Sequence, residues 1–367
     1  MRILQLVNRF DFGGAENHVR ELCNELVANS HQVILVSRNG RQKGLLDNRV
    51  VFIQLPSFAS NFILAQAILI AYLTIRHKID VIHAHQRLPI ISACLAGSIA
   101  RVPVVATVHG RVKHDLRSPI ARKLTSKIIF VRYQALSNLD RFNTIKPKSV
   151  CIPNGIVKPK IKPNFKSNVI GYISRIDKRH FEIIKLLIQA TEKIKRENPA
   201  IKLMLIGDGE KVEELKALVN ETNLKFNDKA IIYLGFVKDI DLLNSFPELI
   251  FGVGRVAIEG LIRGANVISL KSNRMGRVIT PSNYNKYIIT NFIEIDGISP
   301  TLETIYNELK IYYQKRDEYR AEAPALALKI ENDFSISKTT QSIVEAYSTV
   351  LKIKNYPAKS RTLLKST

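Results

Sequence analysis

The stretch Gly252-Val-Gly-Arg-Val-Ala-Ile-Glu-Gly-Leu-Ile-Arg-Gly-Ala-Asn-Val-Ile268 is the most informative part of this sequence. It predicts a glycine turn, a short helix over 255–263 that ends at Gly264, and a buried strand over 266–270. A glycine turn before a helix N-terminus presents free backbone N–H groups and a partial positive charge, which suit an anionic ligand. One carboxylate, Glu259, lies on this helix. The alternative is an ordinary strand–helix unit whose glycines are only caps.

On both sides of this stretch, short apolar runs alternate with segments whose apolar residues recur at helical spacing. The expected strands are 3–7, 32–37, 50–55, 80–85, 104–108, 169–174, 202–206 and 231–234. Helices are expected between them, the most apolar at 62–76. Such alternation is typical of parallel sheets covered by helices. The sequence therefore predicts an α/β protein.

Residues 157–167, Val-Lys-Pro-Lys-Ile-Lys-Pro-Asn-Phe-Lys-Ser, interrupt this alternation and form the best candidate for a linker. We expect an N-terminal Rossmann-like domain over 1–160 and a C-terminal one over 168–336. A helix over 337–356 is expected to return to the N-terminal domain, followed by a disordered basic tail over 357–367. In such folds ligands bind beyond the carboxyl ends of the strands, often between domains.

The chain has 367 residues and a formal net charge of +23, which favours a polyanion, an anionic membrane face or an anionic substrate. Its three cysteines, Cys23, Cys94 and Cys151, lie in apolar contexts without metal-ligand spacing, as is typical of buried thiols in a reducing compartment. The first residues are too quickly polar for a signal peptide, and the longest apolar run, 62–74, is too short to cross a bilayer. We expect a cytoplasmic protein whose membrane contact is peripheral.

The segment Asp11-Phe-Gly-Gly-Ala-Glu16 follows the first expected strand and opens the first helix. Gly13 and Gly14 would let a ligand approach the backbone closely, and the helix dipole favours a phosphate. The third glycine of the dinucleotide-binding fingerprint is missing, so a plain tight turn remains the alternative.

Histidines fall on two of the expected strands. His109, in Ala106-Thr-Val-His-Gly110, would lie at the carboxyl end of its strand and face a cleft, although a purely structural histidine is the alternative. His83 and His85 alternate along another strand and would share a face. Because no further ligands stand at convincing spacing, we predict no metal site.

Cations follow the first strand of the second half. Arg175 and the cluster Lys178-Arg179-His180 could hold a diphosphate, or they could form a solvated loop. Gly207 and Gly209, in Ile206-Gly-Asp-Gly-Glu210, form a further strand-to-helix turn, for which a plain capped turn is the alternative.

Residues 101–166 contain fifteen basic residues and two acids, Asp115 and Asp140. Within 111–132 the basic residues are interleaved with four apolar residues at every fourth position, which is helical spacing. These are Leu116, Ile120, Leu124 and Ile128. A basic amphipathic stretch suits an anionic membrane surface. A nucleic-acid surface would more often show stacking aromatics, so no nucleic-acid partner is expected; a solvated charged face is the other alternative.

Taken in order, these segments resemble the family 4 retaining glycosyltransferases. In the first half, Gly13-Gly14-Ala15-Glu16 resembles the family's N-terminal glycine loop, Thr107-Val-His109 its strand-end histidine, and Ile152-Pro-Asn-Gly-Ile156 its domain-junction signature. The resemblance implies two Rossmann-like domains facing each other across a cleft, the GT-B fold.

In the second half, Arg175 stands where the family has its phosphate-binding arginine. Ile206-Gly-Asp-Gly-Glu210 and Leu234-Gly-Phe236 look like its nucleotide-side turns. Glu259 resembles the second glutamate of its paired-glutamate helix. The resemblance covers nearly the whole chain, and its specificity comes from the ordered set of motifs.

The resemblance implies a nucleotide-diphosphate sugar bound in the cleft, with no bound metal or cofactor. Arg175 would neutralise the leaving diphosphate, Glu259 would accept hydrogen bonds from the nucleotide ribose, and His109 would face the transferred sugar. The remaining residues implied to contact the donor are Gly13, Gly14, Lys178, His180, Gly207, Gly209, Phe236, Gly254 and Arg255. This is catalysis by positioning and by stabilising the leaving group.

Three positions depart from the family pattern. Phe251 stands where the family has its first glutamate, His180 where it has a lysine, and Asn266 where a proline is usual. Members with a Gly-x-Gly-Arg turn, as in Gly252-Val-Gly-Arg255, tolerate loss of the first glutamate.

We therefore predict a retaining hexosyltransferase on the inner face of a membrane, acting on a lipid-linked or envelope glycan. The alternatives are a catalytically impaired protein of the same fold that binds a nucleotide or a partner, a nucleotide-sugar epimerase, and a polyanion-binding protein indicated only by charge.

Overall fold

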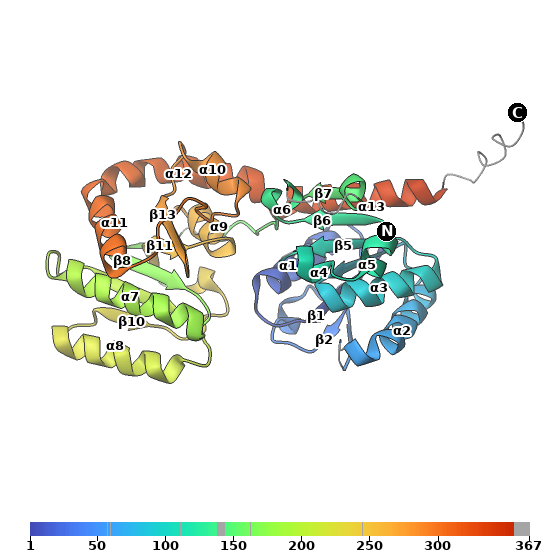
Figure 1. Cartoon of the computed structure of the whole chain (residues 1–367), viewed down its shortest axis with the longest axis horizontal. Helices are drawn as coiled ribbons and strands as arrows, with labels where there is room; N and C mark the ends of the chain where they lie inside the picture. Colours follow the sequence, from blue (N-terminus) through green and yellow to red (C-terminus); the bar gives the residue numbers. More distant parts are fainter. Residues whose placement is uncertain are drawn as a thin grey trace, which may run out of the picture. The chain divides into compact units, whose positions relative to one another are not determined.

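The computed structural model describes residues 1–56, 58, 60–110, 112–137, 144–161, 163–243 and 245–355. The chain divides into two compact units, one made of Met1–Val157 with the segment from Phe334 onward, the other of Lys158–Asp333 (Figure 1). The first unit thus ends three residues before the expected 160 and the second three residues before the expected 336, while the second unit begins at Lys158 rather than at the expected 168. The predicted tail over 357–367 and the basic residues Arg111, Arg141 and Lys162 lie outside the described residues.

The first unit contains a parallel sheet in the order β3-β2-β1-β4-β5-β6-β7, as far as the structure describes it. Its strands are β1 (Arg2–Arg9), β2 (Gln32–Arg38), β3 (Val51–Gln54), β4 (Val81–His85), β5 (Val104–Val108), β6 (Lys127–Phe130) and β7 (Ser149–Cys151). Its helices are α1 (Gly14–Ala28), α2 (Ile63–Arg76), α3 (Arg87–Ala100), α4 (Val112–Asp115), α5 (Pro119–Leu124), α6 (Tyr133–Ser137) and α13 (Ile336–Asn355).

The alternation of side chains along β1 separates two cores. Leu4 and Leu6 pack with apolar residues of α2 and α3, whereas Ile3 and Val7 pack with apolar residues of α1 and α13. Because successive side chains of a strand point to opposite faces, helices cover both sides of the sheet. Gln5 lies on the α1/α13 face, level with His83 of the neighbouring strand β4, so polar side chains stand among the apolar residues of this core.

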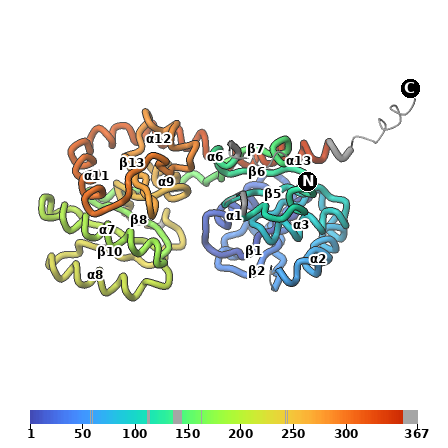
Figure 2. The backbone as a smooth tube through the Cα atoms, in the orientation of Figure 1, coloured from blue at the N-terminus to red at the C-terminus, as the bar shows by residue number. Residues whose placement is uncertain are grey.

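The C-terminal helix α13 belongs to the first unit. The tube in Figure 2 follows the chain out of this unit, through the second, and back into α13. The backbone of Ile156 exchanges two hydrogen bonds with the entry to α13, at 2.7 Å with Phe334 and 2.9 Å with Ile336. A Cβ at Gly155 would come within 2.7 Å of the Ile336 Cα, so the glycine of the 152–156 motif permits this close crossing.

The second unit contains a sheet in the order β10-β9-β8-β11-β12-β13, in which only the pairing of β12 with β13 is antiparallel across the described strands. Its strands are β8 (Phe165–Ile173), β9 (Lys202–Ile206), β10 (Ile231–Tyr233), β11 (Phe246–Gly252), β12 (Asn266–Lys271) and β13 (Arg274–Val278). Its helices are α7 (Lys178–Lys195), α8 (Val212–Phe226), α9 (Arg255–Ile262), α10 (Tyr284–Ile289), α11 (Leu302–Gln314) and α12 (Arg316–Phe334). The two predicted α/β domains with parallel sheets are confirmed.

The segment 111–132 does not form the amphipathic helix that its apolar spacing predicts. It contains two short helices, α4 and α5, followed by strand β6. Leu116 and Ile128 are buried in the core of the unit, whereas Ile120 and Leu124 are exposed. The four residues therefore share no face, because a strand begins where the helical pattern would continue.

Candidate functional site

The predicted site residues of both units follow the carboxyl ends of strands. In the first unit the strand order reverses at β1, which lies between β2 and β4, and in the second it reverses at β8, between β9 and β11. Ligands of open α/β sheets bind beyond the carboxyl ends of strands where the order reverses. Each unit therefore has a candidate half-site at this edge.

In the first unit, the glycine loop leads directly from β1 into α1. Gly13 is the N-cap of α1 and offers no capping side chain, so the first N–H groups of the helix lack the usual side-chain acceptor. A Cβ at Gly14 would meet no atom within 4 Å, so packing does not require a glycine there. The loop thus keeps an open helix N-terminus, which suits an anion.

Gln86, directly after β4, ties this loop to the neighbouring strand. Its Nε2 donates to Glu16 Oε1 at 2.7 Å, and its Oε1 accepts from the Asn8 backbone N–H at 3.2 Å. Its backbone has φ 69° and ψ 160°, a conformation that side chains other than glycine rarely adopt. The cross-link therefore holds a strained residue at the point where the strand order reverses.

Buried polar side chains form a continuous hydrogen-bonded chain beneath His109. Gln5 Nε2 donates to Tyr347 Oη at 3.1 Å, and Tyr347 Oη lies 2.6 Å from His83 Nδ1. In the other direction, Gln5 Oε1 lies 2.9 Å from His85 Nε2, and His85 Nδ1 lies 2.9 Å from His109 Nε2. The chain joins β1, β4 and β5 to helix α13.

This chain assigns the ring protons. Because Gln5 Oε1 can only accept, His85 carries its proton on Nε2 and accepts on Nδ1 from the His109 Nε2–H. His109 Nδ1 is then an unprotonated acceptor, and it is buried without a hydrogen-bond partner among the described residues. The atom therefore suits a donor group of a ligand, such as a sugar hydroxyl.

Burial keeps these histidines neutral. Desolvation, together with the neighbouring His109, lowers the pKa of His83 to about 3. Desolvation lowers the pKa of His109 to about 4, although the charge of Asp115 acts to raise it. The pKa of His85 also lies well below its usual value, because of desolvation and the three neighbouring histidines. At neutral pH the array therefore accepts and donates hydrogen bonds as neutral imidazoles.

In the second unit, Arg175 lies in the loop after β8. It is exposed, and its side chain forms no hydrogen bond or ion pair with any residue that the structure describes. The loop is held by backbone hydrogen bonds from Ser174 N to Ile206 O and from Ile176 N to Asp208 O, both 3.0 Å. A free guanidinium on a fixed loop can bind a diphosphate.

Gly207 and Gly209 lie in close contact with the backbone of this loop, so they do more than form an open turn. A Cβ at Gly207, whose φ is +151°, would lie 1.8 Å from Ser174 O, and one at Gly209 would lie 2.6 Å from Ile176 O. The two glycines thus allow the β9–α8 turn to pack against the backbone that carries Arg175. Their role as direct donor contacts remains a prediction.

His180 is already engaged within its own helix. Asp177 is the N-cap of α7, and its Oδ1 accepts from both the backbone N–H and Nδ1 of His180, at 2.9 and 2.7 Å. Partial burial would raise the pKa of Asp177, but the His180 hydrogen bonds and the Arg179 charge hold it below its usual value. Lys178 is exposed at the first position of α7 and leaves a second cation near Arg175.

Helix α9 carries the predicted ribose contact. Gly254 is its N-cap with φ 57°, a conformation that favours glycine, and its N–H donates to Asn291 O at 2.9 Å. Glu259 Oε1 accepts from Arg255 Nε at 2.7 Å, one helical turn away. Glu259 Oε2 forms no hydrogen bond with the described residues, so this oxygen can accept from a ligand.

Phe251 is fully buried in β11 and packs in the main core of the second unit. The position at which the family has its first glutamate therefore supplies packing here and presents no polar group. Phe236, in the loop after β10, is partly exposed. The carbonyl oxygen of its neighbour Gly235 accepts a hydrogen bond from the Gly207 N–H at 2.9 Å.

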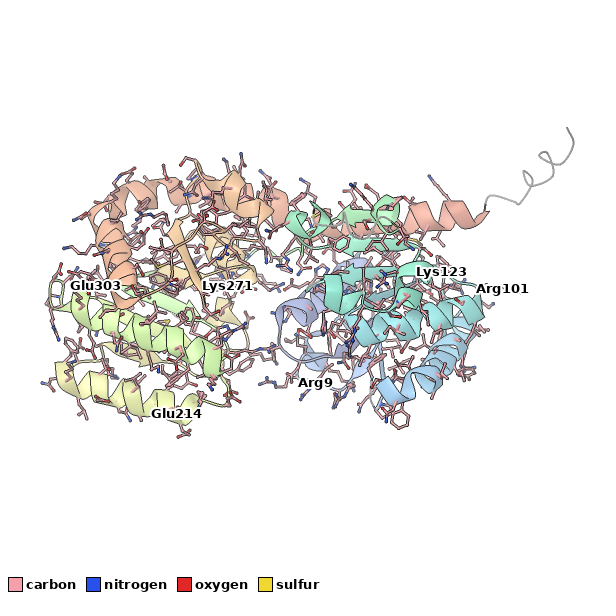
Figure 3. The ribbon with its side chains drawn as sticks, in the orientation of Figure 1. Arg9, Arg101, Lys123, Glu214, Lys271 and Glu303 are labelled. Carbon is pink, nitrogen blue, oxygen red and sulfur yellow. The ribbon has the colours of Figure 1, made fainter. Side chains whose placement is uncertain are left out.

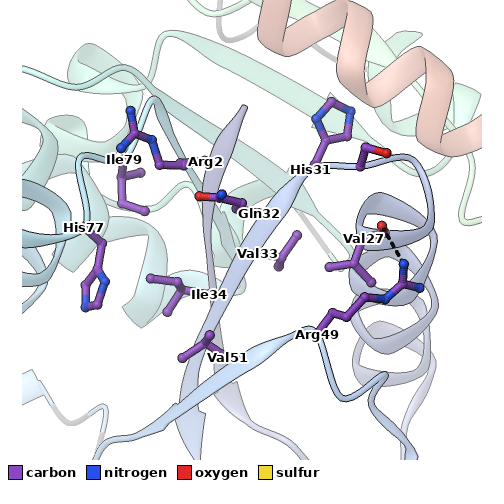
Figure 4. Close-up of a pocket in the computed structure, with 11 residues that line it drawn as sticks. Arg2, Val27, His31, Gln32, Val33, Ile34, Arg49, Val51, His77 and Ile79 are labelled. Atoms are coloured by element: carbon purple, nitrogen blue, oxygen red, sulfur yellow. Dashed lines mark hydrogen bonds between the residues drawn. The ribbon is translucent and has the colours of Figure 1, made fainter.

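Two pockets lie at the amino-terminal edges of the sheets, away from all the predicted site residues. One, of about 440 Å³, is lined by Arg2, His31, Arg49 and His77 among others (Figure 4). Its Arg49 is paired with Asp47 and also donates to Val27 O. The other, of about 550 Å³, lies beside Phe165 and Asn266, at the starts of β8 and β12.

Sequence reasoning missed the residues that support the site. Gln5, Gln86, Tyr347 and Asp177 carry no motif, and the hydrogen bond from Gln5 to Tyr347 joins residues 342 positions apart. The alternation of His83 and His85 on one strand was the available signal, and the two rings do share a face, with centroids 4.2 Å apart. No group of three His, Cys, Asp or Glu side chains suited to a metal is found within the described part of the chain.

Residues 12–157 match the model of Glycosyltransferase Family 4, and residues 156–325 match that of Glycosyl transferases group 1. The chain is 24% identical over 345 residues to the phosphatidylinositol N-acetylglucosaminyltransferase gpi3 subunit of Schizosaccharomyces pombe, covering 84% of this chain and 73% of that protein.

Two solved structures share the fold. A glycosyltransferase from Rickettsia africae has a TM-score of 0.74 and 20% identity, covering 96% of this chain and 98% of its own. Anabaena HepE, crystallised with UDP and glucose, has a TM-score of 0.71 and 19% identity, covering 95% of this chain and 100% of its own. The two family models, which overlap at residues 156–157, and the two α/β units with parallel sheets together identify this chain as a family-4-like glycosyltransferase with the GT-B fold.

Proposed function

We propose that this glycosyltransferase moves a hexose from a nucleotide-diphosphate sugar to a lipid-linked or envelope glycan, with retention at the anomeric carbon. The observation that carries the proposal is Arg175, an exposed guanidinium held at the strand-order reversal of the second unit without an acidic partner among the described residues. The UDP and glucose bound by Anabaena HepE support a sugar nucleotide as donor. The relative named for phosphatidylinositol supports a lipid-linked acceptor.

The chemistry needs charge stabilisation more than a protein nucleophile. The bond from the anomeric carbon to the diphosphate oxygen breaks, the acceptor hydroxyl oxygen forms the new bond, and its proton passes to the departing phosphate. Arg175 and Lys178 offset the charge that develops on the diphosphate, aided by the N-terminus of α9. Glu259 Oε2 accepts from the ribose hydroxyls. In the first unit, His109 Nδ1 accepts from a hydroxyl of a bound sugar.

We further propose that the protein works at the cytoplasmic face of a membrane, in contact with an anionic lipid surface. The net charge of +23 supports this, because anionic lipids attract basic proteins. None of the described helices is long and apolar enough to cross a membrane.

The donor chemistry is tested by mixing the protein with a panel of nucleotide sugars and lipid-linked acceptors and measuring release of nucleoside diphosphate. We expect Arg175→Ala to lower kcat/KM about 10²–10³-fold, the usual loss when one charge-stabilising donor is removed. Arg196→Ala is the matched control, because Arg196 is an exposed arginine at the opposite end of α7.

Equal rates for Arg175→Ala and the wild type would contradict the assigned role of Arg175. No turnover with any common donor would contradict the transferase. Conversion of the donor into a different sugar without an acceptor would instead indicate an epimerase.

A catalytically impaired protein is the second candidate, and two observations favour it. Phe251 is buried where the family has a carboxylate, and His180 is bound to Asp177 where the family has a lysine. Donor binding without turnover by the wild type and by His180→Lys would support this candidate. Gain of turnover by His180→Lys would show instead that only the missing cation limits the reaction.

A further inference from the structure

Helix α2 is apolar on both of its faces. Gln66, Ala67, Ile70, Ala71, Leu73 and Thr74 form its buried face, which packs on α3. The opposite face exposes Leu64, Ile68, Tyr72 and Ile75, with 72, 65, 57 and 62% of their surfaces accessible. Leu69 and the preceding Phe62 are also exposed. Leu64, Ile68, Tyr72 and Ile75 recur at intervals of three or four, so they line one side of the helix.

This surface continues onto the neighbouring helices. Helix α3 packs against both α2 and α5, and Ile99 of α3 and Ile120 and Leu124 of α5 are exposed large apolar residues. Soluble proteins rarely expose apolar patches that extend over several elements unless the patch binds something. We call the exposed residues of α2, α3 and α5 the apolar face.

Basic residues surround the apolar face, and acidic residues are missing from it. Helices α2, α3 and α5 contain no Asp or Glu. Arg76 at the end of α2, Arg101 after α3, Arg117 and Lys123 are exposed, and Arg101 and Lys123 are labelled in Figure 3. From residue 50 to residue 137 the sequence has eleven basic residues and two acids, Asp80 and Asp115.

We infer that the apolar face is a membrane-docking surface, on which α2 lies flat in the interface of an anionic bilayer. With 14 residues, α2 is about 21 Å long, shorter than the roughly 30 Å of a bilayer core, so it can lie in the interface but not span it. Its exposed aliphatic side chains enter the acyl boundary, and the flanking arginines and lysines pair with lipid phosphates.

The charge pattern selects this occupant over a second copy of the chain. Two copies joined through this face would bring their own arginines and lysines together with no acid on the three helices to offset them, which is unfavourable. An anionic lipid surface is complementary to the same pattern. The inference deepens the proposed function, because it names the surface that would bring the enzyme to a lipid-linked acceptor.

The test uses the full chain and co-sedimentation with vesicles of phosphatidylcholine, alone or mixed with phosphatidylglycerol. We expect the wild type to bind the mixed vesicles, and Leu64→Gln/Ile68→Gln to bind them at least tenfold more weakly. Leu224→Gln is the matched control, because Leu224 lies on α8 with 81% of its surface exposed, and we expect it to bind like the wild type. Arg76→Gln/Lys123→Gln should weaken binding to mixed vesicles and remove its salt dependence in part.

The inference would be overturned if the wild type did not bind the mixed vesicles, or if Leu64→Gln/Ile68→Gln bound them as tightly as the wild type. So would a lipid-free dimer of the wild type, seen by light scattering, that Leu64→Gln/Ile68→Gln dissociates. Binding of UDP, measured by calorimetry without lipid, separates the two proposals. An α2 variant that no longer binds vesicles but still binds UDP supports the docking surface. A wild-type protein that binds vesicles but has no affinity for UDP or other nucleoside diphosphates contradicts only the proposed function.

Discussion

His109 shows how a residue with an ordinary sequence context acquires a defined chemical state. Its Nε2–H donates to His85 of β4, and the proton position of His85 depends in turn on Gln5 of the neighbouring strand β1. The ring of His18 packs edgewise against it, with the centroids 5.7 Å apart, and Asp115 is the acid that acts on its pKa. The lone pair on Nδ1 is therefore set by neighbours rather than by His109 itself.

The depressed pKa values predict a loss of stability between pH 6.5 and 4.5. In this window the unfolded histidines, with pKa near 6.5, bind protons, whereas folded His83 and His109, with pKa about 3 and 4, do not. The unfolded state binds more protons, so the free energy of unfolding falls as the pH is lowered. Acids with depressed pKa, such as Asp47 at about 2, lose their contribution only below this window.

Thermal unfolding measured from pH 7.5 to pH 4.5 checks this prediction. We expect His109→Gln to show a smaller fall in Tm than the wild type, since one titrating group is removed. Parallel curves for the two proteins would show that His109 is not buried in the neutral form.

At the scale of elements, two turns that follow strands of the second unit stabilise each other by direct packing. The β9–α8 turn lies against the loop after β8 and leaves no space for a side chain at Gly207. A glycine that looks like a ligand contact in the sequence is therefore also a structural requirement of the loop that carries Arg175.

Gly207→Ala is expected to reduce the free energy of unfolding by about 1–3 kcal/mol, because the new Cβ meets Ser174 O and the backbone keeps φ +151°. Gly14→Ala is the control, since a Cβ there meets nothing within 4 Å, and its effect should stay within about 0.5 kcal/mol. Denaturant unfolding measures both. If Gly207→Ala is as stable as Gly14→Ala, the two loops do not pack as tightly as the structure indicates.

At the scale of the whole molecule, the chain closes its first unit with its last described helix. Ile343, Ala346, Tyr347 and Val350 of α13 complete the core that β1 and α1 begin. Tyr347 also accepts from Gln5 and donates to His83, so α13 takes part in the histidine array.

Tyr347→Phe removes a hydroxyl shared by two buried polar groups, which should lower the free energy of unfolding by about 1–3 kcal/mol. Ser348→Ala, one position along α13, removes a hydroxyl whose only partner among the described residues is Val344 O, within the helix, and should cost about 0.5 kcal/mol or less. Chemical denaturation checks the difference. Equal stabilities of the two variants would show that the contact between α13 and Gln5 does not stabilise the fold.

Much of the candidate site could be predicted from the sequence because it lies in strand-end turns, which have local signals. Glycines, a strand-end histidine and an arginine after a strand can each be recognised within a few residues, and topology then brings them to one edge of each sheet. The amphipathic interpretation of 111–132 was wrong because helical spacing can arise by chance across a helix, a turn and a strand. The apolar run at 62–74 was recognised, but not which of its faces stays exposed.

By itself, the sequence determined the alternation of strands and helices, the two-domain organisation and the basic charge, since periodicity and composition are local or additive properties. Only the tertiary structure decided the protonation of His109, the burial of Phe251, the pairing of His180 with Asp177 and the exposure of one face of α2. Most of these depend on which side chains the fold brings together, in one case from positions more than 300 residues apart, those of Gln5 and Tyr347. Desolvation and hydrogen bonding act between spatial neighbours, so these properties appear only when the sheets and helices have packed.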